Sequence, residues 1–319
     1  MESSGEMKVA VLIPCYNEAQ TIAGVVADFR RVLPSAGIWV YDNNSTDGTG
    51  EIARKAGAFV RREYRQGKGF VVRSMFAEID ADVYVLVDGD DTYPAEAAPA
   101  LIAAVAEGRA DMAVGDRLTN GTYREQNKRR FHDLGNGLVR GAINLLFRAG
   151  IRDVMTGYRA FSRRFVKNFP VMTGGFEIET EMTLHALDKR FAVEQIPIDY
   201  RDRPEGSASK LHTFRDGARV IRTLLSIFKD YKPLSFYGGL ALLFFLLGLA
   251  AGVPVLGEYA KTAYITHVPL AILASALEIM ALLALSSGLV LDTLVKADKR
   301  NYELSLLRGA DAPGTGGKD

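Results

Sequence analysis

The stretch Val85-Leu-Val-Asp-Gly-Asp-Asp-Thr-Tyr-Pro94 runs a short apolar segment directly into three acidic residues. Asp88, Asp90 and Asp91 repel one another, and a strand end with this much negative charge usually meets a cation. Mg²⁺ and Mn²⁺ take oxygen ligands and suit one or two carboxylates together with the phosphates of a substrate. The stretch therefore predicts a buried strand that ends at a divalent cation site, although an Asp-x-Asp sequence alone is also typical of a solvated turn.

Apolar segments alternate with helical patterns on the N-terminal side of this stretch. Strands are predicted at 9–14, 38–42, 59–63 and 83–88, and helices at 18–33, within 45–58 and at 67–79. This alternation predicts an α/β fold with a parallel sheet wound with helices. Polar clusters at 14–18, 42–47 and 88–91 follow three of the strands, and sheets of this kind bind ligands at the carboxyl ends of their strands.

Composition narrows the class of protein. The 319 residues carry 39 Lys and Arg against 38 Asp and Glu, so the overall charge gives no support to nucleic-acid binding. The single cysteine, Cys15, excludes an internal disulfide and fits a reducing compartment. The acidic start and the short apolar run after it do not predict a signal peptide.

Two long apolar segments follow the α/β region. Residues 234–256 contain no charge and residues 268–291 contain only Glu278, and about 20 apolar residues span a bilayer. Basic residues flank the pair, which predicts a transmembrane hairpin with both termini cytoplasmic. The alternative is a buried helical pair in a soluble protein. Glu278 is costly in lipid, so we expect it either between the spans or at a subunit contact in a homo-oligomer.

The segment before the first span is amphipathic. Apolar residues recur at spacings of three and four from Leu211 to Tyr231, and basic residues fill much of the rest. This predicts an interfacial helix lying on the membrane, and the alternative is a helix docked on the globular domain.

The polar clusters together resemble a known family. Pro14-Cys-Tyr-Asn-Glu18, Asp42-Asn-Asn-Ser-Thr-Asp47, Gly67-Lys68-Gly69 and Asp88-Gly-Asp90 resemble, in order and spacing, the inverting family 2 glycosyltransferases of GT-A fold. Two predicted transmembrane spans follow these clusters and narrow the resemblance. Residues 8–230 look similar to polyprenyl-phosphate glycosyltransferases, which include dolichyl-phosphate mannose and glucose synthases and bacterial undecaprenyl-phosphate relatives.

The resemblance implies an α/β architecture of GT-A type, a Rossmann-like and mostly parallel sheet flanked by helices. Its domains would be a cytoplasmic catalytic domain at 1–210, interfacial helices at 211–233, two transmembrane helices at 234–291, and a partly disordered cytoplasmic tail at 292–319.

The resemblance also implies roles for particular residues. Asp88 and Asp90 would hold Mg²⁺ or Mn²⁺ and, through it, the donor diphosphate. The nucleotide sugar would contact Pro14, Tyr16, Glu18, Asp42, Lys68, Asp88, Arg203 and Lys210. The acceptor phosphate would meet Arg117, Arg129, Arg130, Thr156 and Arg159. The catalytic residues would be Asp90, Arg117, Arg129 and Asp153.

The chain departs from the family pattern at several positions, among them Asn44, where the family commonly has Gly. Asn43 stands where the family commonly has a second Asp, and Thr92 stands where mannose synthases often have Gln. The Phe131-His132 pair resembles dolichyl-phosphate glucose synthases and favours a UDP-sugar over GDP-mannose.

The implied reaction is transfer of one sugar from a nucleotide sugar to a polyprenyl phosphate in the bilayer. The acceptor phosphate is already ionised and needs no general base, whereas the leaving diphosphate needs a cation and the approach of two anions needs arginines. A processive polysaccharide synthase would need a Gln-x-x-Arg-Trp stretch, and the only tryptophan is Trp39. The remaining alternatives are another lipid acceptor and a non-catalytic, membrane-anchored protein that binds nucleotide sugars.

Overall fold

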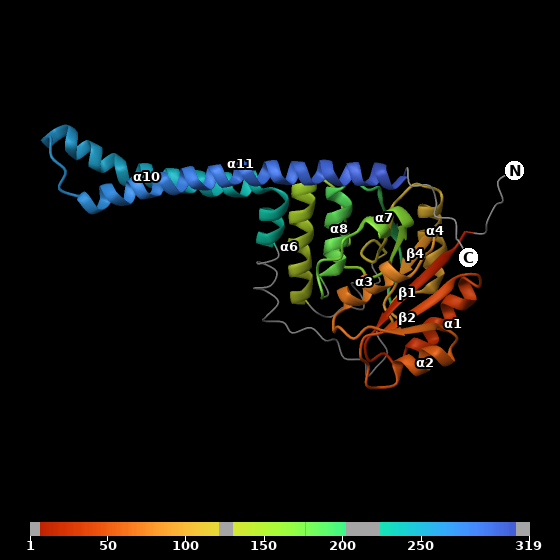
Figure 1. Ribbon diagram of the computed structural model, residues 1–319. Helices are drawn as coiled ribbons and strands as arrows, with labels where there is room; N and C mark the ends of the chain where they lie inside the picture. The colour runs from red at the N-terminus through yellow and green to blue at the C-terminus, as the bar shows by residue number, and fades with distance from the viewer. Residues whose placement is uncertain (1–6, 121–129, 176, 202–223, 311–319) are drawn as a thin grey trace. The chain divides into compact units, whose positions relative to one another are not determined.

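The computed structural model describes residues 7–120, 130–175, 177–201 and 224–310, with the backbone alone for 130–136 and 308–310. The chain divides into two compact units, Met1–Asp216 and Gly217–Asp319. The first contains the sheet and the second contains the two longest helices described (Figure 1).

The first unit is built on one mixed sheet. Its strands lie in the order β3-β2-β1-β4-β6-β5-β7. Their bounds are β1 (Val9–Cys15), β2 (Gly37–Asp42), β3 (Phe59–Arg62), β4 (Val83–Leu86), β5 (Met112–Asp116), β6 (Arg159–Ser162) and β7 (Val193–Pro197). Strand β6 is antiparallel to β4 and β5, and the other paired strands are parallel. The expected α/β fold with a mostly parallel sheet is confirmed, and the four predicted strands match β1 to β4 within two residues at each end.

Helices cover both faces of this sheet (Figure 1). One face packs against α1 (Ile22–Val32), α2 (Thr49–Lys55) and α4 (Ala98–Ala106), and the other against α3 (Lys68–Glu78), α7 (Arg163–Asn168) and α8 (Ile178–Asp188). A short η1 (Ala95–Ala97) precedes α4, and α6 (Arg130–Phe147) lies between β5 and β6. Successive strand residues alternate between the two faces, so Val11 and Ile13 join the core with Phe29 of α1.

Helix α1 begins four residues later than predicted. The backbone N–H of Glu18 donates to Thr49 Oγ1 at 2.9 Å, and that of Ala19 donates to Asp47 Oδ2 at 3.0 Å. These bonds hold residues 18–21 in a turn against the loop after β2. The tertiary contact therefore overrides the local helical pattern at this end.

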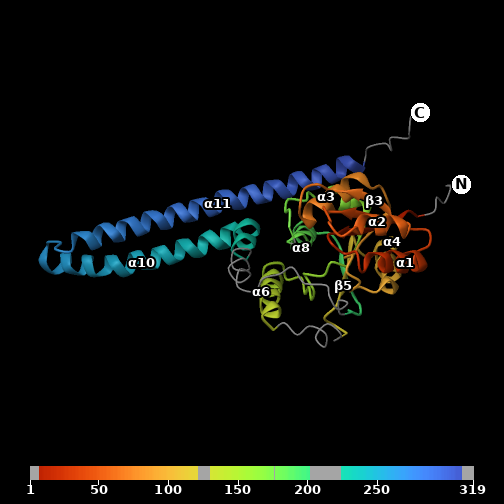
Figure 2. The same ribbon diagram turned by 90° about the horizontal axis from the view of Figure 1, so that it is seen from below.

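The second unit contains α10 (Pro233–Thr262) and α11 (Val268–Ala310), which run side by side in both views (Figures 1 and 2). Both are long and apolar enough to cross a membrane. Helix α11 continues well beyond the predicted span at 268–291, and the ion pair between Lys296 and Asp292 at 2.7 Å has the spacing that supports a helix there. Most of the predicted interfacial segment, residues 211–223, lies outside the described residues, whereas 224–231 are helical.

Glu278 lies between these two helices. A methyl group added at Gly248 of α10 would be 2.5 Å from Glu278 Oε1. This is the first of its two expected positions, and it keeps the carboxyl group against protein instead of facing outward alone.

Candidate active site

The loops at the carboxyl ends of β1, β2 and β4 share an unusual backbone feature. Asn17, Asn44 and Asp91 have φ values of 55°, 65° and 60°, in the left-handed region that Asn and Asp adopt more readily than other residues with a side chain. Such conformations persist where surrounding contacts enforce them, and they concentrate at functional sites. The three turns lie at one edge of the sheet, because β1, β2 and β4 are parallel neighbours.

The loops after β1 and β2 are fastened to each other. The Asn17 N–H donates to Ser45 Oγ at 2.9 Å, and Asn17 Oδ1 accepts from the Thr46 N–H at 2.9 Å. Asp42 Oδ1 accepts from the Ser45 N–H at 2.9 Å. These bonds hold Tyr16 and Glu18, in the loop after β1, beside the loop that follows Asp42 at the end of β2.

Asn43 has a structural role that the sequence did not indicate. Its side chain is buried, and Nδ2 donates to the carbonyl oxygens of Glu63 and Arg65 at 2.9 and 2.8 Å. Its Oδ1 accepts from the Gly67 N–H at 2.7 Å and from Gln66 Nε2 at 3.3 Å. An aspartate could accept but not donate here, so the amide suits this chain at a position where the family commonly has Asp.

Lys68, the first residue of α3, is held between two carboxylates. Its Nζ lies within hydrogen-bond distance of Asp88 Oδ1 and of Glu179 Oε1 on α8. Burial alone would lower the pKa of Lys68, but the charges of Asp88 and Glu179 raise this pKa above its ordinary value. The ammonium is therefore charged at neutral pH.

The start of α3 is seated directly on the backbone of residues 173–174. The Gly69 N–H donates to the Gly174 carbonyl oxygen at 3.2 Å. A methyl group added at Gly69 would lie 2.0 Å from the Thr173 carbonyl oxygen. The Gly-Lys-Gly sequence thus permits a contact that any side chain at Gly69 would obstruct, and this contact places Lys68.

Asp88 and Asp90 supply two carboxylates at the end of β4. Asp90 is 4% exposed and accepts from the Thr92 hydroxyl at 2.7 Å. A methyl group added at Gly157 would lie 2.4 Å from Asp88 Oδ2. Glycine at this position therefore leaves room for the Asp88 carboxylate. Within the described part of the chain, no three His, Cys, Asp or Glu residues gather in a metal-binding cluster. Two carboxylates fit a Mg²⁺ or Mn²⁺ ion whose coordination is completed by substrate phosphate and water.

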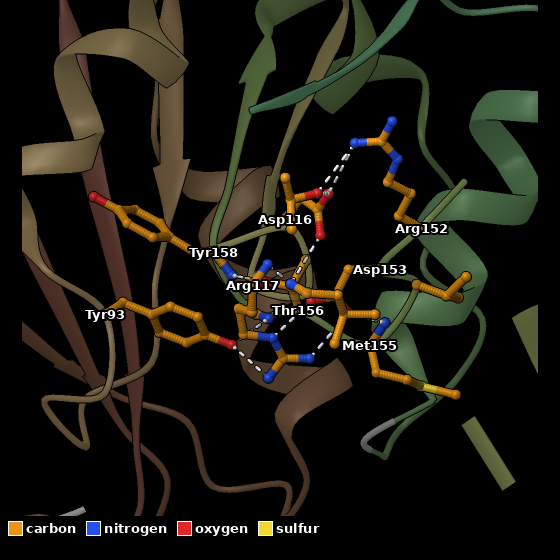
Figure 3. Close-up of polar contacts among 12 residues, drawn as sticks. Tyr93, Asp116, Arg117, Arg152, Asp153, Met155, Thr156 and Tyr158 are labelled. Carbon is orange, nitrogen blue, oxygen red and sulfur yellow. Dashed lines mark hydrogen bonds and ion pairs between the residues drawn. The ribbon is translucent and has the colours of Figure 1, made fainter. Parts of the chain in front are cut away.

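Arg117 and Asp153 form a buried bidentate pair (Figure 3). Arg117 Nε donates to Asp153 Oδ2 at 2.7 Å and Nη2 donates to Oδ1 at 3.0 Å. Arg117 Nη1 also donates to the Tyr93 hydroxyl at 3.2 Å, which in turn accepts from the Gly157 N–H at 3.0 Å. Two residues predicted near the chemistry are thus brought together, and Tyr93 links them to the segment beside Asp88.

Arg159 and Thr156 lie deeper than predicted. Both are fully buried, and the Arg159 guanidinium donates to the carbonyl oxygens of Val154 and Thr156 at 2.6 and 3.1 Å and to Thr183 Oγ1 at 2.9 Å. Burial lowers the pKa of Arg159 to about 10. Its donors hold the loop that precedes β6, so the direct contact with an acceptor phosphate that was expected of Arg159 is not supported by this placement.

Several predicted residues fall outside the description. Arg129, Arg203 and Lys210 are not among the described residues, and Arg130 opens α6 without a described side chain. The side chains of Phe131 and His132 are likewise outside it.

Sequence reasoning missed Glu179. In the sequence, Glu177, Glu179 and Glu181 alternate, and this spacing is typical of one face of a strand, either exposed or lining an active site. Residues 178–188 form a helix, however, in which a period of two does not define a face. Glu179 is 5% exposed and faces Lys68, and Glu181 accepts from the backbone N–H groups of Met172 and Thr173. Recognising α8 as a helix would have separated Glu179 from the other two glutamates, but it would not have identified Lys68 as its partner.

Comparisons with known proteins agree with this architecture. Residues 10–169 match the profile described as glycosyl transferase family 2. Glycosyltransferase AglJ of Haloferax volcanii is 32% identical over 296 residues, which cover 92% of this chain and 96% of that protein. Dolichyl-phosphate hexose transferase of the same organism is 31% identical over 219 residues, covering 69% of this chain and 93% of that protein.

A solved structure shows the same fold. Glucosyl-3-phosphoglycerate synthase of Mycobacterium tuberculosis, in complex with Mn²⁺ and UDP-glucose, is similar with a TM-score of 0.55 and 20% sequence identity. The likeness covers 70% of this chain and 78% of that one.

Proposed function

Because this chain belongs to glycosyl transferase family 2, we propose that it transfers one sugar from a nucleotide sugar to a polyprenyl phosphate of the membrane, with inversion at the anomeric carbon. The observation that carries the proposal is the sheet edge at which Asp88 and Asp90 follow β4, with Lys68 beside Asp88 and Arg117 linked to the same edge through Tyr93. The named activity of the dolichyl-phosphate hexose transferase supports a polyprenyl phosphate as acceptor.

The donor would lie across the ends of β1, β2 and β4. Pro14, Tyr16, Glu18 and Asp42 would line the nucleoside, and Asp88 and Asp90 would hold Mg²⁺ or Mn²⁺ at the diphosphate. When bound, such an ion stabilises the negative charge of the leaving nucleoside diphosphate. The solved neighbour that contains Mn²⁺ and UDP-glucose supports a UDP-sugar as donor. Arg203 and Lys210 stay proposed donor contacts.

The acceptor phosphate needs positive charge more than it needs a base. It is ionised near neutral pH, so no side chain has to remove a proton before attack. Asp153 fixes the orientation of Arg117, whose guanidinium matches the geometry of phosphate oxygens. Arg129 and Arg130 are proposed as further contacts.

The two apolar helices fit an acceptor that stays in the bilayer. We take α10 and α11 as a transmembrane hairpin with the catalytic unit and both termini on the cytoplasmic side. The hairpin would keep the enzyme at the surface where the lipid phosphate is presented.

A transfer assay tests the proposal. Purified full-length protein in detergent is incubated with UDP-glucose, UDP-GlcNAc, UDP-galactose or GDP-mannose, together with undecaprenyl phosphate and Mn²⁺ or Mg²⁺. We expect a metal-dependent, acid-labile glycolipid with one UDP-sugar. Release of nucleotide without glycolipid would indicate another acceptor. Absence of turnover with every donor would favour the alternative, in which the protein binds nucleotide sugars without catalysing transfer.

A further inference from the structure

Lys68 contacts one of the two carboxylates assigned to the metal. We propose that Lys68 and the divalent cation replace one another at Asp88, and that Glu179 is the positioning residue that retains the ammonium when the cation is bound. The inference rests on the proposed function in one respect, which is that Asp88 is a metal ligand.

The three groups come from separate elements. Lys68 begins α3, Asp88 follows β4, and Glu179 lies in the first turn of α8. The side chains of Lys68 and Glu179 are 9% and 7% exposed, whereas that of Asp88 is 29% exposed. The ammonium is thus shielded from water together with Glu179, while Asp88 stays partly accessible to solvent. A buried ammonium without a carboxylate partner would be strongly unfavourable. When Asp88 binds the divalent cation, Glu179 remains as the partner of the Lys68 ammonium.

Charge explains why the two cations compete. Two carboxylates around one ammonium carry a net charge of minus one, which favours a cation nearby. An ammonium and a divalent ion on the same carboxyl group, however, repel each other at close range. The donor diphosphate adds negative charge that offsets this repulsion. The metal alone should therefore bind weakly, and metal and nucleotide should each strengthen the binding of the other.

Glu179 also explains why Lys68 can give up Asp88 without large movement. Its oxygen already contacts the ammonium, so only the bond to Asp88 has to break. Loss of the Glu179 charge should make the ammonium depend on Asp88 and compete more strongly with the ion.

The test measures binding of Mn²⁺ alone to full-length protein in detergent, without nucleotide, from the electron paramagnetic resonance signal of free Mn²⁺. Lys68→Met should tighten Mn²⁺ binding by about tenfold or more, the factor expected for one charged hydrogen bond. Glu179→Gln should weaken it by about threefold or more. Arg65→Gln is the matched control. Arg65 is a cation in the connection that leads from β3 to Lys68, and it pairs with Glu63. Its effect should stay within about twofold.

The double variant Lys68→Met/Glu179→Gln separates exchange from an artefact. We expect it to bind Mn²⁺ more tightly than the natural protein, because the competing ammonium is gone. Tightening in Lys68→Met that disappears in the double variant would mean that Glu179 had become a metal ligand, and this would overturn the proposal. Unchanged or weaker binding in Lys68→Met would also overturn it. If Lys68→Met fails to fold, the double variant, which removes one charge of each sign, decides the question by the same comparison.

The outcome is distinguishable from failure of the proposed function. If the natural protein binds Mn²⁺ together with UDP, but Lys68→Met and the double variant bind Mn²⁺ no more tightly than the natural protein does, only the proposed exchange at Asp88 is overturned. Absence of both nucleotide binding and sugar transfer would remove the proposed function.

Discussion

The Asp90 carboxylate is largely buried after the end of β4. Its hydrogen bonds hold it in one orientation, which suits a metal ligand. Thr92 donates to Asp90 Oδ1 through its hydroxyl and, at 3.3 Å, through its backbone N–H. We expect Asp90→Ala to lower kcat/KM of sugar transfer by about 100-fold or more, which is typical for loss of a group that stabilises transition-state charge. The transfer assay measures this.

The control for Asp90→Ala is Asp28→Ala, which removes an exposed carboxylate that pairs with Arg31. It should retain near-normal activity, because exposed ion pairs contribute little. Normal activity in Asp90→Ala would exclude this residue from the metal site.

The side-chain amide of Asn43 holds the connection between β3 and α3 in place. In Asn43→Asp the two donors to the carbonyl oxygens of Glu63 and Arg65 are lost and a carboxylate faces those oxygens instead. We expect the free energy of unfolding to fall by about 2–4 kcal/mol at neutral pH. Trp39, the only tryptophan, lies in β2 of the catalytic unit, so its fluorescence during urea titration reports unfolding of that unit.

Asn43→Ser is the companion variant, since it keeps one short hydrogen-bonding group without adding charge. A smaller loss than in Asn43→Asp is expected. Equal stability of Asn43→Asp and the natural protein would show that the amide donors are dispensable.

At the scale of elements, the connection from β3 to α3 is stabilised by Glu63. Hydrogen bonds from Arg65, at 3.0 Å for both Nε and Nη2, are the main reason that the pKa of Glu63 falls to about 2. The unfolded pKa is about 4.3, so the stabilisation is present above that pH and is lost as the pH falls toward 2. Because Arg65 is half-exposed, we expect about 1–2 kcal/mol.

Comparison of natural protein and Glu63→Gln by urea titration at several pH values checks this. The difference in unfolding free energy should be largest near pH 7 and should decrease between pH 5 and pH 2. A difference that does not depend on pH would show that hydrogen bonding by the neutral side chain, and not the charge, is responsible.

The docking of α3 on residues 173–174 is a second element-scale feature. In Gly69→Ala the Thr173 carbonyl oxygen must move, and we expect a loss of about 1–3 kcal/mol in stability and lower transfer activity, because Lys68 moves with the helix start. Gly24→Ala in α1 is the matched control. Apart from the adjoining residues and the backbone of α1 itself, no atom lies within 4 Å of its added methyl group, so the higher helix propensity of Ala should stabilise the protein by about 0.5–1 kcal/mol. Similar effects of the two substitutions would contradict the docking argument.

For the whole molecule, the proposed hairpin predicts which sites are reached from each side of the membrane. In a Cys15→Ala background, cysteine is placed at Lys261, near the connection between α10 and α11, or at Glu51 in α2. A membrane-impermeant maleimide applied to intact cells should label Lys261→Cys, and should label Glu51→Cys only after permeabilisation. Labelling of both sites only after permeabilisation would favour a helical pair that does not cross the membrane.

The candidate site could be predicted in part. Motif order predicted Asp88, Asp90, Arg117 and Asp153 as site residues, and the structure places the first two after β4 and pairs the other two with each other. The partners of these residues could not be predicted, since Glu179 reaches Lys68 from 111 positions away along the chain. For Arg159 the sequence context predicted a phosphate contact, whereas the structure shows a fully buried side chain that donates to the carbonyl oxygens of Val154 and Thr156.

The sequence by itself determined the alternation of strands and helices, the acidic end of β4 and the two apolar helices, because hydrophobic periodicity and run length depend on neighbours in the chain. Only the tertiary structure decided that β6 runs antiparallel between β4 and β5, that α1 begins at Ile22, that Asn43 fastens a distant connection, and that Lys68 rests between Asp88 and Glu179. Each of these depends on which residues remote in sequence come within hydrogen-bond or packing distance, and local pattern carries no record of such distances.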